Sequence, residues 1–134
     1  MENCIFCEIV KGDIPSTTIY EDKYTLAFLD ITPVSRGHTL VIPKKHHQDI
    51  FDIPEDALNH IMVTVKKIAI ALDKIADGIN IGQNNKAAAG QDVFHIHFHV
   101  MPRYAGQDTF KLWEGKPYAE GDAEKTAAEI KNLL

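Results

Sequence analysis

The sequence contains no apolar run approaching the roughly 18 residues that a membrane-spanning helix needs. Its first residues, Met1-Glu2-Asn3-Cys4, lack the basic segment and the apolar segment that together make a signal peptide. These two absences argue against an integral membrane protein and against a secreted one. We therefore expect a cytoplasmic protein with no membrane partner.

Positive charge is also scarce, since 14 lysines and arginines stand against 19 acidic residues and the net charge is −5. A nucleic-acid-binding protein needs a basic face that collects phosphates, so we expect no nucleic-acid partner. A small phosphate ester stays open as a ligand, because a local pocket can bind an anion within an acidic protein.

Cysteine is limited to one pair, Cys4-x-x-Cys7. A disulfide between them is disfavoured in a cytoplasmic protein. A thioredoxin-like redox pair would need a βαβ context, which the sequence does not predict. A structural zinc site would need two further ligands, because such sites are tetrahedral.

The 134 residues fit a single domain, and the composition of 45% hydrophobic and 25% charged residues is ordinary for a globular protein. Runs rich in β-branched and aromatic residues predict strands over 17–20, 25–29, 38–42, 79–82 and 93–101, with Pro102 stopping the last. The small, polar segment 83–91 is predicted as a loop, and 106–121 yields no prediction.

Apolar residues at helical spacing from Leu58 to Ile75 predict one long helix. Pro54 suits its first turn, Asp52 with Glu55 resembles a capping box, and Gly78 can end it. A last helix is predicted from Asp122, as N-cap, to the C-terminus. The fold class is α+β, with a mostly antiparallel sheet and the long helix laid across it.

Three histidines at alternate positions, His95, His97 and His99, form the most informative pattern in the chain. In a strand such residues share one face, spaced by about 6.5–7 Å, while Ile96 and Phe98 point to the other. Imidazole changes charge near neutral pH, is a competent nucleophile and is a common metal ligand. Three within five residues therefore predict a functional site.

The His95-x-His97-x-His99 motif, with apolar residues between, is similar to the signature of the histidine-triad (HIT) family. Other segments match in order and spacing: Ile5-Phe6-Cys7-Glu8-Ile9 with Ile14-Pro15, 27–31, 37–46 and Gly90-Gln91. The chain most resembles the Hint-like branch, specifically its bacterial-type members with an N-terminal Cys-x-x-Cys. The resemblance implies a single HIT domain over 1–134, with a five-stranded sheet, one long helix, a short N-terminal helix and a C-terminal helix.

The family is known for nucleotide hydrolases and transferases that act at an α-phosphate. The resemblance implies that His97 attacks phosphorus and forms a nucleotidyl-histidine intermediate, which water then releases. The backbone carbonyl of His95 would hold the other ring nitrogen of His97, and His99 would donate to the phosphate or the leaving group. Neutral imidazole can attack at pH 7 without a separate base.

The resemblance also implies a nucleotide site of the AMP or GMP type. Asp30 would bind the ribose hydroxyls, and the apolar residues Leu29, Ile31, Phe6 and Ile9 would contact the base, although core packing explains these four nearly as well. Hydrogen-bond donors around the phosphate would come from Asn84 and Gln91, with Gly90 allowing close backbone approach.

One position departs from the common eukaryotic Hint pattern, which has a serine three residues before the first histidine. Here that residue is Asp92. A carboxylate repels a phosphate unless it is turned away, protonated or paired, so we leave Asp92 out of the predicted site.

For the cysteine pair, the resemblance implies a structural Zn²⁺ site completed by His46 and His95, as in some cysteine-bearing HIT proteins and related uridylyltransferases. It also implies a homodimer in which the C-terminal segment, about 105–134 with Trp113, reaches toward the partner protomer. No cofactor is needed for the chemical step.

Hydrolysis of nucleoside phosphoramidates is the favoured function. The alternatives are a dinucleoside polyphosphate hydrolase, a nucleotide-binding adaptor with incidental catalysis, and a metal-binding structural protein. The last would leave Asn84, Gly90, Gln91 and the three histidines unexplained.

Overall fold

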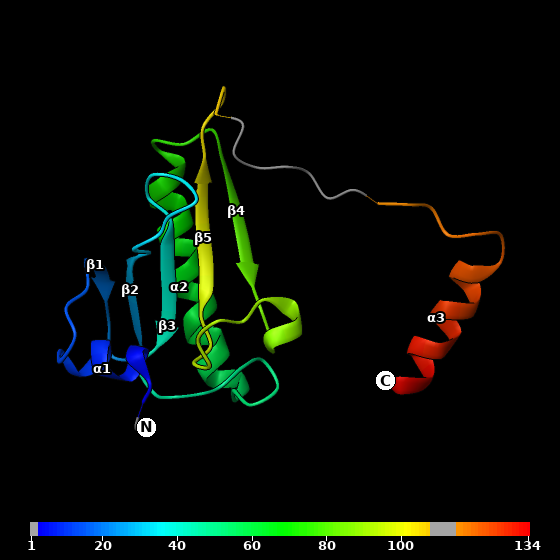
Figure 1. Cartoon of the computed structure of the whole chain (residues 1–134), viewed down its shortest axis with the longest axis horizontal. Helices are drawn as coiled ribbons and strands as arrows, with labels where there is room; N and C mark the ends of the chain where they lie inside the picture. The colour runs from blue at the N-terminus through cyan, green and yellow to red at the C-terminus, as the bar shows by residue number, and fades with distance from the viewer. Residues whose placement is uncertain (1–2, 108–114) are drawn as a thin grey trace.

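The computed structural model describes residues 3–107 and 115–134, so Trp113 lies outside the described residues. The described part has one five-stranded sheet, three α-helices and a short 3-10 turn (Figure 1). The helices are α1 (Ile5–Lys11), α2 (Glu55–Asp73) and α3 (Asp122–Leu133), with η1 (Ala87–Ala89). The strands are β1 (Thr18–Glu21), β2 (Thr25–Leu29), β3 (Thr39–Pro43), β4 (Gly78–Gln83) and β5 (Phe98–Arg103). These elements confirm the α+β class, the long helix and the short N-terminal helix.

The strands are ordered β1-β2-β3-β5-β4, and every neighbouring pair is antiparallel. β5 therefore lies between β3 and β4, with His99 opposite Leu40 on one side and opposite Gly82 on the other. This register brings the start of β3, next to residue 38, close to the triad segment.

One face of the sheet is closed by α2 (Figure 1). Along α2, Ile61, Val65 and Ile68 are buried, as the helical spacing of apolar residues predicts. The core between α2 and the sheet consists of Ala27, Val41, Ile53, Ile61, Val65, Ile68, Ile96, Phe98 and Val100.

The opposite face is partly covered by α1, which is only seven residues long. Cys4 caps this helix, since its sulfur accepts a hydrogen bond from the Cys7 amide. Gly12 ends it at a φ of 86°, a left-handed conformation that glycine adopts without strain. The second core cluster, beneath α1, consists of Cys4, Phe6, Cys7, Leu26, Phe28, Leu40 and Ile42.

The predicted ends of α2 are wrong. Pro54 is the N-cap with no side-chain cap hydrogen bond, and the Asp52 carboxylate accepts from the Gln48 amide instead of forming a capping box. At the other end the helix stops at Asp73, and Gly78 opens β4 opposite Arg103. Because Gly78 pairs with Arg103 of β5, it belongs to strand β4 and does not end the helix.

The last strand also differs from its prediction, because β5 begins at Phe98 rather than Val93 and continues through Pro102 to Arg103. The Ile96 amide donates to the carbonyl of His47, outside the sheet ladder. Pro102 is tolerated because its carbonyl, accepting from the Ser35 hydroxyl, points to the β3 side, where pairing has ended at Thr39 opposite Val100. Its missing N–H falls on that same side.

The C-terminal helix α3 begins at Asp122, but the N-cap is Gly121 rather than Asp122, and no side chain caps it. α3 has no buried residue, and Figure 1 shows it standing apart from the sheet.

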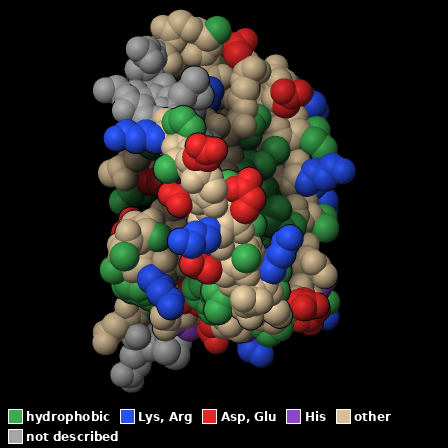
Figure 2. All heavy atoms as spheres, turned by 90° about the vertical axis from the view of Figure 1, so that its right-hand side faces the viewer, with side chains coloured by type: hydrophobic (Ala, Val, Ile, Leu, Met, Phe, Trp, Pro, Cys, Tyr) green, Lys and Arg blue, Asp and Glu red, His purple; other side chains and the backbone are tan. Residues whose placement is uncertain are grey.

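The face in Figure 2 carries acidic and basic side chains intermixed, without a broad basic patch. Across residues 3–107 and 115–134, no helix combines the length and apolar character needed to cross a membrane.

Candidate functional site

The three histidines lie on the α1 side of the sheet, although β5 starts only at Phe98. The Phe6 ring packs edge-on against His95 and His97, with centroids 5.8 and 5.2 Å away. The rings of His97 and His99 are 5.1 Å apart. The backbone over 93–97 therefore keeps the alternation of a strand, while Ile96 points into the core under α2.

His97 is held by the main chain two residues before it. Its Nδ1–H donates to the His95 carbonyl oxygen at 2.9 Å. A neutral imidazole carries one proton, so Nε2 keeps its lone pair. The ring is 96% buried but lines a cavity. An unprotonated imidazole nitrogen is chemically capable of nucleophilic attack.

His99 is oriented by His38, which sequence analysis did not place in the site. The Val34 amide donates to His38 Nδ1 at 3.1 Å, so neutral His38 carries its proton on Nε2. That Nε2 lies 2.9 Å from His99 Nδ1, which must then accept. His99 consequently carries its own proton on Nε2 and is a hydrogen-bond donor there.

Burial keeps the rings of His99 and His38 neutral near pH 7. Desolvation, with smaller contributions from His97 and His38, lowers the pKa of His99 to about 4. Desolvation also lowers the pKa of His38, partly opposed by Asp30, whose Oδ2 lies 3.6 Å from His38 Nε2. The tautomers inferred for His99 and His38 from their hydrogen bonds therefore apply at neutral pH.

His97 and His99 open onto a cavity of about 240 Å³ beneath α1. Most of its wall is apolar, and the carboxylate of Asp30 and the carboxylate of Asp92 are its charged lining groups. Ile31 is 95% exposed at its rim, so this side chain is not core. Among the predicted nucleotide contacts, the cavity brings together Phe6, Ile9, Leu29, Asp30 and Ile31.

The other predicted nucleotide contacts, Asn84, Gly90 and Gln91, do not line this cavity. Gln91 is buried, and its carboxamide donates to the carbonyls of Gln48 and Val93. The Asn84 amide donates to the Gly90 carbonyl at 3.4 Å. The side chains of Asn84 and Gln91 and the carbonyl of Gly90 therefore hold the loop before the triad together.

Asp92, which sequence reasoning leaves out of the site, lies within it. Its Oδ1 is 3.5 Å from His97 Nε2, and the side chain is 81% exposed. The Val93 amide donates to the same oxygen at 3.0 Å, which fixes the carboxylate beside the histidine. The departure from serine at this position was the available signal, but the direction of the side chain could not be read from it.

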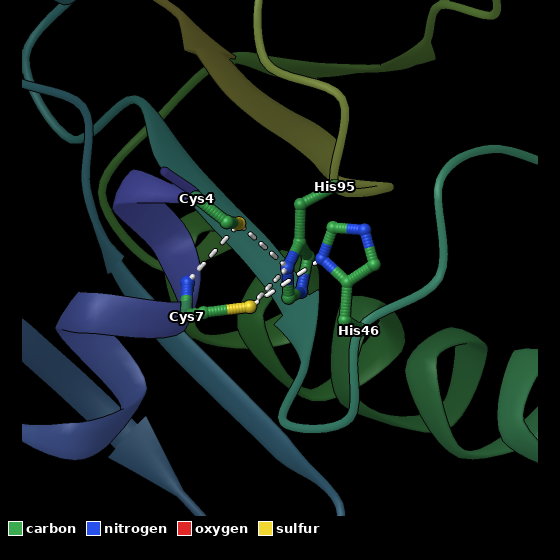
Figure 3. Close-up of side chains that lie close together, drawn as sticks. All are labelled: Cys4, Cys7, His46 and His95. Carbon is green, nitrogen blue, oxygen red and sulfur yellow. Dashed lines mark hydrogen bonds between the residues drawn. The ribbon is translucent and has the colours of Figure 1, made fainter. Parts of the chain in front are cut away.

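Behind the triad, Cys4, Cys7, His46 and His95 point toward one another (Figure 3). Their potential ligand atoms all lie within 4.8 Å of one another. Cys4 Sγ lies 3.4 Å from His95 Nδ1, and Cys7 Sγ lies 3.4 Å from His46 Nδ1 and 3.6 Å from His95 Nδ1. Burial, then the neighbouring Cys4, raises the pKa of the Cys7 thiol.

The donor set fits a tetrahedral zinc ion. With Zn–S and Zn–N bonds of about 2.3 and 2.0 Å, sulfur and nitrogen ligands are about 3.5 Å apart, close to the distances found here. His95 also presents the right nitrogen, because its Nε2–H donates to the Pro43 carbonyl at 2.8 Å and leaves Nδ1 unprotonated. Desolvation lowers the pKa of His95 to about 4, which keeps that nitrogen free of a proton.

Fold and site together define an α+β protein in which three alternating histidines connect a Cys₂His₂ cluster to an apolar cavity. A family model described as the HIT domain matches residues 11–106. The chain belongs to the HIT domain family.

Individual relatives cover nearly the whole chain. An adenosine 5′-monophosphoramidase of Schizosaccharomyces pombe is 45% identical over 133 residues, covering 98% of both chains. A HIT family protein of Bacillus anthracis, solved by crystallography, is 43% identical with a TM-score of 0.88 and covers 99% of this chain and 98% of that one. A Zn-bound histidine triad protein of Mycobacterium smegmatis is 40% identical with a TM-score of 0.78, covering 98% of each chain.

Proposed function

We propose that the protein hydrolyses nucleoside 5′-phosphoramidates through a nucleotidyl intermediate on His97. The observation that carries the proposal is the hydrogen bond from His97 Nδ1–H to the His95 carbonyl, which leaves Nε2 as a lone pair facing the cavity. The similarity to the S. pombe adenosine 5′-monophosphoramidase supports the same reaction class.

The reaction proceeds by two displacements at phosphorus. His97 Nε2 forms a bond to the α-phosphorus, the P–N bond breaks, and the nitrogen leaves as an amine after protonation by solvent. Water then attacks phosphorus and gives up a proton to solvent as the bond to Nε2 breaks. The nucleoside monophosphate leaves, and the neutral imidazole of His97 is regenerated. Two easier steps replace one difficult step, which is the usual gain from nucleophilic catalysis.

The positions of the ring protons determine the roles that we propose for His95 and His99. The His95 carbonyl stabilises the positive charge that develops on the His97 ring when Nε2 is bonded to phosphorus. His99 Nε2–H donates a hydrogen bond to a phosphoryl oxygen, because His38 occupies its other nitrogen. Neither role needs a bound metal.

The nucleotide lies along the apolar cavity with its phosphate at His97. Asp30 accepts hydrogen bonds from the ribose hydroxyls, and Phe6, Ile9, Leu29 and Ile31 contact the base. Asn84, Gly90 and Gln91 do not line this cavity, so in this proposal their loop holds the segment before the triad in place.

Zinc at Cys4, Cys7, His46 and His95 is part of the proposal, supported by the donor geometry and by the Zn-bound relative from M. smegmatis. The ion would serve structure, tying α1 to the start of the triad segment. Each ligand residue would hold it through the sulfur or nitrogen that already faces the centre of the cluster.

A homodimer and a cytoplasmic location complete the proposal. β4 lies at the edge of the sheet and exposes half of the Ile81 side chain, so it offers a strand and an apolar residue to a second copy. The C-terminal segment, about 105–134, would then reach toward the partner's site.

The test is mass spectrometry of the protein quenched during turnover of an adenosine 5′-phosphoramidate. We expect an added AMP mass on His97, and we expect His97→Ala to lose both the adduct and turnover while still binding AMP. His60→Ala is the matched control, because His60 stacks on Tyr24 outside this cavity. Unchanged turnover in His97→Ala would refute the proposal, and faster turnover of a diadenosine polyphosphate would shift it to that substrate class.

A further inference from the structure

A second cavity, of about 380 Å³, adjoins the first on the side of the Cys₂His₂ cluster. The two cavities share Ile5, Asp92 and Val93 in their walls. Asp92 therefore stands at the boundary between them, with its Oδ1 3.5 Å from the nitrogen of His97 that bonds to phosphorus. A substrate with its nucleotide in the first cavity can extend its other substituent past Asp92 into the second.

Among the described residues that line the second cavity, the charged side chain is negative. Its described lining residues are Asn3, Cys4, Ile5, His46, Gln48, Asp92, Val93 and Phe94, which include no lysine or arginine. Asp92 is thus the one permanently charged side chain among them. A cluster of two thiolates, two neutral histidines and Zn²⁺ has no net charge, so bound zinc leaves this imbalance in place.

A negative wall discriminates between leaving groups. A polyphosphate leaving group would bring several negative charges beside Asp92 with no lysine or arginine in either described lining to offset them. An amine that carries a second, cationic group would place that group beside the carboxylate. The nucleotide itself keeps the same contacts in both cases.

We propose that Asp92 and the second cavity form a leaving-group subsite that selects phosphoramidates of amines bearing a positive charge. The inference rests on the proposed function and specifies its substrate class. Asp92 is a specificity residue here: it contacts the departing part of the substrate and leaves the nucleophilic attack to His97.

The test compares three adenosine 5′-phosphoramidates whose amines have equal length and end in an ammonium, a methyl or a carboxylate group. Because Asp92 is 81% exposed, we expect kcat/KM for the ammonium compound to exceed that for the methyl compound by about three- to fivefold, as for an exposed ion pair. The carboxylate compound should fall below the methyl compound by a similar factor. Both ratios should shrink from about 0.01 M to 1 M salt, because the screening length falls from about 30 to 3 Å.

Asp92→Asn keeps the size of the side chain and removes its charge, so all three compounds should then react at rates within about twofold of one another. Asp73→Asn, at the end of α2, makes the same change in net charge away from both cavities and should keep the wild-type order. Equal rates in the wild type, or an ammonium preference that survives in Asp92→Asn, would overturn the subsite while leaving the phosphoramidase standing. No hydrolysis of any of the three would overturn both.

Discussion

One face of the sheet carries the nineteen-residue helix α2, whereas the other carries only the seven-residue α1. Under α2 the buried hydrophobic side chains are almost all aliphatic, Ile61 and Val41 have no exposed surface, and the buried hydroxyls of Thr25 and Thr64 hydrogen-bond to each other. Under α1 the covering helix is too short to close the face, and histidines, thiols and a cavity occupy the remainder. The closed face supplies cohesion, and the partly covered face supplies the chemistry.

The largest expected effect is a loss of stability from a change on the α2 face that leaves nucleotide binding on the α1 face unchanged. Ile61→Ala, in the centre of the α2 core, should lower the free energy of unfolding by about 2–5 kcal/mol, because it removes a buried aliphatic group and leaves a cavity. AMP affinity of the folded protein should stay as in the wild type. Urea unfolding and calorimetric titration with AMP measure the two quantities, and a parallel loss of AMP affinity would show that the faces are not separable.

A second change acts on the face with α1. If zinc fills the cluster, free zinc at about a hundred times its Kd should stabilise the fold by about 2.7 kcal/mol, and Cys4→Ser should abolish that gain. Thermal unfolding with and without a chelator, with elemental analysis, provides the measurement. Cys4→Ser protein that still gains the full stabilisation would rule out this ligand set.

Acid should weaken the histidine face selectively. The pKa values of His95 and His99 are about 4 in the folded protein, against about 6.5 for an ordinary histidine, with desolvation the main cause. Below about pH 6.5 these two histidines bind protons in the unfolded chain but stay neutral in the folded protein. The free energy of unfolding therefore falls as the pH decreases toward about 4. Urea midpoints of metal-free protein at a series of pH values test this, and His99→Asn should flatten the slope, whereas Ile61→Ala should shift the curve without flattening it.

The smallest effect concerns the ribose end of the cavity. Asp30→Asn should weaken AMP binding by about 1 kcal/mol, roughly fivefold in Kd, because a charged acceptor becomes a neutral amide. Deoxy-AMP, lacking one ribose hydroxyl, should lose less affinity on this substitution than AMP does. Equal losses for both ligands would place the ribose elsewhere.

Local sequence patterns predicted α2 and the strands, whereas the short helix α1 was expected only from the resemblance to the HIT family. The apolar spacing along α2 gave its buried stripe, and the alternation around His97 gave the shared histidine face. The predicted ends of helices and strands were wrong where hydrogen-bond partners distant in the sequence determine them. Ile96 bonds to the carbonyl of His47, so the strand starts later than its pattern, and Gly78 pairs with Arg103, so it cannot end the helix.

A local motif was sufficient to predict that the three histidines share one face. Contacts that depend on the sheet register or on the direction of a side chain were not predicted. His38 meets His99 only because Leu40 lies opposite His99 in the sheet, a register that no short motif states. For Asp92 the sequence revealed the charge but not its direction toward His97. The sequence placed Gln91 at the phosphate, whereas its amide is engaged by the carbonyls of Gln48 and Val93.

The hydrogen bond from His97 to the His95 carbonyl has a genetic consequence. No codon change at position 95 can delete that oxygen, because every amino acid carries it. What mutation can change is its position, since the His95 ring lies among the sulfurs and its Nε2–H is bonded to Pro43. Mutations at the residues that hold the His95 ring, Cys4 and Cys7 included, can therefore shift the position of this carbonyl oxygen, although no substitution at position 95 removes it.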